Sequence, residues 1–149
     1  KTNIGELNVG DKVNLEGSLT LNKTLGGHFV FGHVDDTGVV TSMKQLKSDN
    51  KKDSDNWEYW IRIHKKFAQY IIYVGSIAVD GVSLTVAEVK KPKGNYFEIK
   101  VAIIPYTYHN TLFGKLKVND RVNLEFDFLG KYVINMLSAN PKLKKLMKS

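Results

Sequence analysis

The chain has 149 residues, of which 42% are hydrophobic and 25% are charged, and this composition is typical of a globular domain with one core. It contains no cysteine, which excludes disulfides, thiol nucleophiles and cysteine-based zinc sites. The net charge is +7, but residues 131–149 supply five lysines and no acid, a distribution that argues against nucleic-acid binding. The longest apolar stretch, residues 67–74, is too short to cross a bilayer, so we expect a cytoplasmic protein without nucleic-acid or membrane partners.

Alternating apolar residues predict short strands along most of the chain. In chain order, strands are expected at residues 13–19, 29–34, 39–43, 57–63, 76–79, 83–89, 97–103 and 121–128. Turns or loops are expected at residues 35–38, 47–56 and 90–95, and short helices at 65–72, 105–112 and 131–137. The Asp80-Gly81 pair predicts a type I′ hairpin turn. The pattern indicates a mainly-β fold, a six-stranded antiparallel Greek-key barrel with short helices and a C-terminal helix.

An internal repeat divides the chain. Residues 2–16 and 111–125 are identical at nine of fifteen positions without a gap, and similarity at a fixed offset indicates a duplicated structural unit. The second copy ends a long unit that begins near Gly26, whereas the first copy has no such unit before it. We therefore expect residues 1–25 to be the end of a first barrel, residues 26–130 to form a second barrel, and residues 131–149 to form a C-terminal helix and basic tail.

Three segments have a composition that is unusual for a scaffold. Residues 26–35 combine glycines with His28 and His33, which indicates a backbone that something approaches closely. Residues 75–86 read Gly-Ser-Ile-Ala-Val-Asp-Gly-Val-Ser-Leu-Thr-Val, and residues two apart on a strand share a face, so Ser83 and Thr85 should point the same way. Residues 104–111 place a threonine beside a rigid Ile-Pro turn.

Together these three ordered segments and the repeat resemble the riboflavin synthase family over almost the whole chain. The resemblance implies a fold of two similar six-stranded barrels, a homotrimer, and a dismutation of two 6,7-dimethyl-8-ribityllumazine molecules to riboflavin and 5-amino-6-(D-ribitylamino)uracil. It implies no cofactor and no metal. It also implies that the active site lies between the first barrel of one subunit and the second barrel of a neighbour, and that lumazine and riboflavin are the ligands.

The reaction needs a group that moves a proton from a substrate methyl and donors around the ring. The resemblance assigns catalysis to His33, Ser83, Thr85 and Asp127, where the carboxylate would polarise Ser83 or a water. The substrate-binding residues that it implies are Gly32, His33, Val34, Ser83, Leu84, Thr85, Ile104, Pro105, Tyr106, Thr107, Tyr108 and His109. His28 is expected to be structural, and Asp127 could equally cap a helix.

The same residues also allow two other functions, a hydrolase and a binding protein without catalysis. Ser83, His33 and Asp127 could form a hydrolase triad, but no nucleophile-elbow pattern surrounds the serine. Family members often carry a basic residue at the position of Val74, a small or polar one at Phe31, and an arginine at Gly17. These departures keep open an alternative, a relative that binds a lumazine or flavin without turning it over.

Overall fold

The computed structural model describes residues 1–47 and 55–140. Six strands form the sheet: β1 (Asp36–Leu46), β2 (Asn56–His64), β3 (Ser76–Val79), β4 (Val82–Val89), β5 (Tyr96–Ile103) and β6 (Arg121–Phe126). The α-helices are α1 (Pro105–Asn110) and α2 (Phe128–Ala139), and the short 3-10 helices are η1 (Ile4–Glu6), η2 (Lys65–Tyr70) and η3 (Leu112–Lys115).

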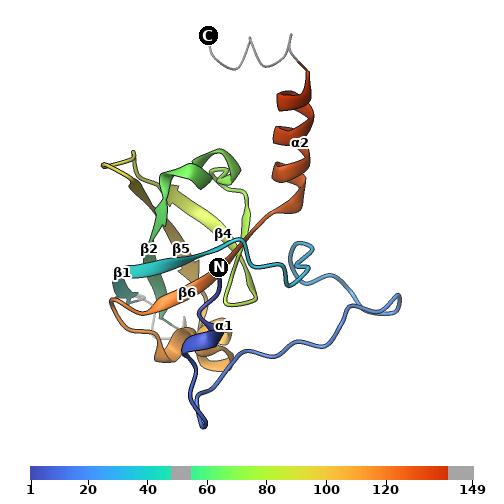
Figure 1. The fold of residues 1–149 in the computed structure, drawn as a ribbon. Coiled ribbons are helices and arrows are strands. Elements are labelled where there is room, and N and C mark those ends of the chain that lie inside the picture. Colours follow the sequence, from blue (N-terminus) through green and yellow to red (C-terminus); the bar gives the residue numbers. More distant parts are fainter. Residues whose placement is uncertain (48–54, 141–149) are drawn as a thin grey trace.

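The six strands close into a barrel in the order β1-β2-β5-β4-β3-β6 (Figure 1). Every neighbouring pair is antiparallel. Strands β3, β4 and β5 follow one another, and β6 then returns to lie beside β3, which is the Greek-key arrangement. The predicted fold class is confirmed.

Alternation of apolar and polar residues fills the barrel. Strand β2 shows this most clearly, because Tyr59, Ile61 and Ile63 are buried while the residues between them are not. Burial raises the pKa of Tyr59 to about 12, and its hydroxyl donates to the Phe113 carbonyl at 2.7 Å, which ties η3 to the core. Strand β2 also contributes Trp57 and η3 contributes Phe113, and the remaining core side chains come from the other strands: Val40, Ile77, Val79, Val86, Phe97, Ile99, Val101, Ile103, Val122, Leu124 and Phe126.

The predicted hairpin between residues 76 and 89 is present. Asp80 and Gly81 form the turn with φ values of +45° and +80°, as a type I′ turn requires. The helix predicted at residues 131–137 is longer, beginning at Phe128, because Asp127 caps it. The predicted loop at residues 47–56 lies mostly outside the described residues.

Three local predictions were wrong. Residues 29–34 are not a strand, because backbone amides there bind side chains instead of another strand, for example Phe31 N to Glu125 Oε1 at 2.7 Å. Residues 36–38 are not a turn but the start of β1. A Cβ atom at Gly38 would lie 2.6 Å from Ile61 Cγ2, so this glycine allows close packing within the strand rather than chain reversal.

Residues 13–19 are the third exception, since they are irregular rather than a strand. They copy the sequence of β6, but β6 hydrogen-bonds to β1 and β3. No equivalent neighbours flank residues 13–19 among the described residues, and a strand without a partner leaves its backbone groups to water. Leu15 is accordingly 91% exposed.

The repeat nevertheless has the same local structure in both copies. Ile4 N donates to Thr2 Oγ1 at 3.2 Å, and Phe113 N donates to Thr111 Oγ1 at the same distance. Asn8 N and Lys117 N likewise each donate to the aspartate three residues later at 2.7 Å. Each copy also has a 3-10 helix at the equivalent place. Local hydrogen bonds therefore fix this segment in both settings.

Candidate functional site

A histidine and a serine meet where the glycine-rich segment crosses the β3–β4 hairpin. His28 N donates to Ser83 Oγ at 3.1 Å, and His28 Nδ1 lies 2.7 Å from the same oxygen. Gly27 makes this approach possible, because a Cβ atom there would lie 2.6 Å from Ser83 Cβ. His28 Nε2 is buried and has no hydrogen-bond partner among the described residues. The imidazole thus has one nitrogen engaged by the hydroxyl and one enclosed without a partner in that part of the chain.

Ser83 and Thr85 lie on the outer face of β4. Between and after them, Leu84 packs against the core and Val86 is fully buried, so the two hydroxyl-bearing residues must face away from the barrel interior. Thr85 is exposed and Ser83 is half-buried. The predicted common face of the two residues is confirmed, and any ligand that they contact binds outside the barrel wall.

Three hydrogen bonds, from Asn123 and Asn14, hold the turn that precedes Ser83. Asp80 N donates to the Asn123 carbonyl at 2.9 Å, and Asn123 N donates back to Asp80 Oδ1 at 2.7 Å. The Asp80 carbonyl accepts from Asn14 Nδ2 at 2.9 Å. Burial raises the pKa of Asp80 to about 6, opposed in part by the hydrogen bond from Asn123. Sequence reasoning missed these residues, although the Val-Asn-x-Glu repeat marks both asparagines.

His33 does not join this cluster. It is exposed and makes no hydrogen bond within residues 1–47 and 55–140, so the hydroxyl of Ser83 contacts His28 and not the histidine that the sequence favoured. Gly32, with φ of +75°, turns the chain just before it, and Val34 is half-buried. A signal for His28 was present, because it directly follows the Gly26-Gly27 pair.

Asp127 acts as a helix cap. Its Oδ1 accepts from Leu129 N at 3.0 Å at the start of α2, and no hydrogen bond joins it to Ser83. Two other carboxylates join the glycine-rich segment to β6. Glu125 on β6, 7% exposed, accepts from Phe31 N, and Asp35 Oδ2 in the segment accepts from Phe126 N at 2.8 Å. Sequence reasoning did not identify Glu125, whose burial only the tertiary contact produces.

The Ile-Pro segment forms α1, with Pro105 at its first turn. Ile104 and Tyr106 are 57% and 74% exposed, whereas Thr107 is half-buried and its carbonyl accepts from Thr111 Oγ1 at 2.7 Å. The remaining two predicted contacts have aromatic partners, since Tyr108 stacks on Trp57 with ring centroids 3.7 Å apart and His109 meets both rings edge-on. Strand β5 runs antiparallel to β4, so α1 begins at the barrel end where β4 starts.

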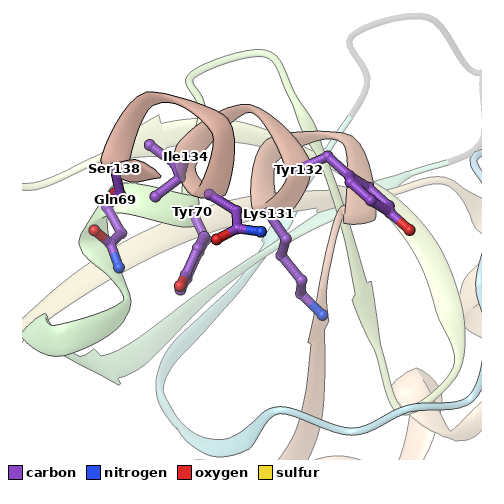
Figure 2. Close-up of a pocket in the computed structure, with 7 residues that line it drawn as sticks. Gln69, Tyr70, Lys131, Tyr132, Ile134 and Ser138 are labelled. Atoms are coloured by element: carbon purple, nitrogen blue, oxygen red, sulfur yellow. The ribbon is translucent and has the colours of Figure 1, made fainter. Parts of the chain in front are cut away.

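A pocket of about 390 Å³ lies elsewhere, between η2 and α2. Figure 2 shows its lining side chains, two from η2 and the rest from α2. They are Gln69, Tyr70, Lys131, Tyr132, Ile134, Asn135 and Ser138. None belongs to the predicted site, and Lys131 is paired with Asp35 at 2.6 Å. We therefore take the His28–Ser83 contact, and not this pocket, as the candidate site.

Neither a metal-binding cluster nor a membrane-spanning helix is present in the described part of the chain. Within residues 1–47 and 55–140, no group of three or more His, Cys, Asp or Glu side chains could hold a metal ion. The helices described here are also too short or too polar to cross a membrane.

The chain is similar to known proteins of one family. The family model of the lumazine binding domain matches residues 31–127. The chain is 40% identical over 140 residues to riboflavin synthase of Mycobacterium bovis, covering 93% of this chain and 65% of that protein. For riboflavin synthases of Actinobacillus pleuropneumoniae and Bacillus subtilis the identities are 37% and 33%, with 95% and 91% of this chain and 60% and 58% of those proteins covered. The chain thus spans less than two thirds of the length of these relatives.

Solved structures share the fold. LumP in complex with 6,7-dimethyl-8-(1'-D-ribityl) lumazine superposes with a TM-score of 0.59 at 23% identity, covering 84% of this chain and 60% of that one. LumP in complex with riboflavin gives 0.58 at 24% identity, covering 84% and 61%. The family match over most of the chain, the relatives and the barrel that carries the Ser83 hairpin lead to one conclusion: the chain belongs to the riboflavin synthase family and contains its lumazine-binding domain.

Proposed function

We propose that this chain is the second-barrel part of a riboflavin synthase and binds one 6,7-dimethyl-8-ribityllumazine, the substrate of the dismutation to riboflavin and 5-amino-6-(D-ribitylamino)uracil. Residues 1–25 are then the end of a first lumazine-binding barrel, residues 26–130 the second, and residues 131–149 a C-terminal helix and basic tail, of which the helix joins subunits in a homotrimer. The observation that carries the proposal is the His28–Ser83 contact, which leaves a buried ring nitrogen without a partner in residues 1–47 and 55–140.

The arrangement supports specific roles. Ser83 and Thr85 present hydroxyls to a pteridine lying outside β4, and the imidazole of His28 exchanges a proton with Ser83 or directly with the ligand. His33, on the exposed turn after Gly32, is free to reach the same ligand. The exposed residues at the start of α1 and the backbone near Gly32 and Leu84 hold the ring edge and ribityl chain. No cofactor takes part in this scheme.

Dismutation needs two pteridines held face to face, and this chain supplies one site. We expect it to bind the lumazine or riboflavin without turnover by itself, because proximity contributes about 7 kcal/mol or more to such two-substrate reactions. The experiment titrates the 149-residue chain with each ligand by fluorescence and follows riboflavin formation from the lumazine. Turnover of about 1 per second, a rate typical of enzymes, would show that one barrel suffices and contradict the two-site scheme.

A pair of matched glycine variants tests the location. Gly27→Ala pushes a Cβ against Ser83 and should weaken riboflavin binding about tenfold, because close-packed contacts resist such insertion. Gly5→Ala makes the same change where no atom lies within 4 Å and should bind as the parent does. Equal affinities for all three chains would place the ligand elsewhere.

The alternative function, ligand binding without turnover even in a full-length protein, has one observation in its favour. Val74 is 65% exposed beside the glycine that opens the hairpin, with φ of +62°, and it brings no charge where relatives often have a basic residue. Val74→Lys in a full-length protein would raise turnover if this position limits catalysis and leave it unchanged if it does not.

A further inference from the structure

One asparagine of the first repeat joins two segments of the barrel. The Asn14 amide donates from Nδ2 to the Asp80 carbonyl and accepts at Oδ1 from Leu112 N, each at 2.9 Å. Asn14 is half-buried while its neighbours on either side are exposed. Both ends of the amide are therefore used, and together they fix the distance between the β3–β4 turn and the start of η3.

The two joined segments each lead to a part of the candidate site, one to Ser83 and the other to α1. Asp80 precedes Ser83 by three residues in the hairpin that contacts His28. Leu112 directly follows Thr111, whose hydroxyl donates to the Thr107 carbonyl of α1. Movement of either segment would change the separation between the hydroxyls of β4 and the start of α1, which is the space that a ligand bridging them must fit.

The second copy of the repeat makes the mirror-image contact. Asn123 occupies the position equivalent to Asn14, and its Oδ1 accepts from Asn3 N at 2.9 Å, where Asn3 is the equivalent of Leu112. The Asn123 side chain also accepts from Thr2 Oγ1 and donates to Asn3 Oδ1. Each asparagine side chain thus binds the other copy of the repeat and not its own.

We infer that Asn14 is a positioning residue: the closing segment of one barrel braces the ligand site of the other, and the duplicated Val-Asn-x-Glu motif makes this bracing reciprocal. The inference deepens the proposed function and rests on it for the identity of the ligand. When its supporting segments are loose, a site is able to bind ligand for only a fraction of the time. Its apparent Kd is then the intrinsic Kd divided by that fraction.

The test compares Asn14→Ala with Asn123→Ala in the 149-residue chain, with riboflavin as the probe. Asn14→Ala should raise the Kd for riboflavin about tenfold, whereas Asn123→Ala, whose lost side-chain contacts lie at residues 2 and 3, should stay within about twofold of the parent. Hydrogen exchange without ligand gives the second readout. Asn14→Ala should speed amide exchange in peptides covering residues 78–84 and 108–114, and leave β2 and β5 protected as in the parent.

The outcomes separate the two proposals. Exchange that rises equally in all peptides, or in none, overturns the bracing role, as does an equal loss of affinity in both variants. If the parent chain fails to bind riboflavin while Asn14→Ala selectively loosens both segments, the bracing contact stands and the proposed ligand is wrong.

Discussion

Asp80 illustrates how one residue meets two opposing demands. Its carboxylate accepts from Asn123 N and fixes the hairpin turn, but burial of the charge is unfavourable and raises its pKa from 3.8 to about 6. Its backbone is also in the left-handed region, with φ of +45°, which asparagine tolerates at least as well as aspartate. The geometry of the turn therefore needs the oxygen acceptor and not the negative charge.

The first prediction concerns pH and Asp80→Asn. Because the folded-state pKa lies above the unfolded one, Asp80 binds more protons in the folded state between about pH 4 and 6, and its contribution to stability declines as pH rises through that window. The loss is roughly 3 kcal/mol. Asn keeps the acceptor without the charge, so the variant should be more stable than the parent by about 2 kcal/mol at pH 7 and equal to it near pH 4.

Urea unfolding at pH 4, 5, 6 and 7 measures this difference. Asp11→Asn, at an exposed carboxylate that accepts from Asn8 N, is the control and should stay within about 0.5 kcal/mol of the parent throughout. A difference between Asp80→Asn and the parent that does not grow with pH would show that the carboxylate is already well solvated.

At the scale of elements, the contact between the two repeat copies contains two equivalent pairs of charged residues, one pair with opposite charges and the other with like charges. Arg121 pairs with Glu6 across the contact. Their equivalents are Lys12 and Lys115, so the mirrored position holds two positive charges. Desolvation and the nearby Lys12 lower the pKa of Lys115. Half of this contact is thus stabilised by opposite charges and the other half is opposed by like charges.

The second prediction is that Lys115→Glu stabilises the chain. It converts the like-charge pair into an ion pair that matches Glu6–Arg121, and the melting temperature should rise by about 2 °C at low salt. The gain should largely disappear in 1 M NaCl, because screening is then effective within about 3 Å. Lys117→Glu changes the net charge equally at a nearby exposed position and is the control. An equal rise for both variants would assign the effect to net charge alone.

At the scale of the whole molecule, α2 stands out from the barrel (Figure 1). Leu129, Tyr132, Val133 and Met136 are between 55% and 70% exposed and follow the i, i+3, i+4, i+7 spacing of one helical face. Phe128 at the base of the helix packs edge-on against Phe31 with ring centroids 5.1 Å apart. Exposed apolar stripes of this kind are typical of interfaces.

The third prediction is that α2 mediates self-association. The chain should sediment as an oligomer, and a trimer is the proposed state. Met136→Glu places a charge at the C-terminal end of the stripe and should weaken association by about 2 kcal/mol or more, while the exposed Asn135→Glu, off the stripe, should not. A parent chain that sediments as a monomer at the same concentrations would refute the role of this face.

The sequence by itself determined several features that depend on near neighbours in the chain. The alternation in residues 57–63 predicted β2. Asp80-Gly81 predicted the turn between β3 and β4, because an Asp-Gly pair readily adopts two positive φ values. The repeat also kept its turn and 3-10 helix in both copies, since each Thr and Asp binds amides only two or three residues away. The common face of Ser83 and Thr85 followed from the period of a strand.

Only the tertiary structure decided which distant groups meet. Residues 13–19 and β6 share the sequence Val-Asn-Leu-Glu, yet only β6 is a strand, because pairing requires neighbours that the local sequence does not contain. His28 rather than His33 contacts Ser83 because the chain from Gly27 to Phe31 is held by side chains of β4 and β6, which no local pattern encodes. The same holds for Asn14, whose amide joins residues 66 and 98 positions away and which the sequence marks only as part of a repeat.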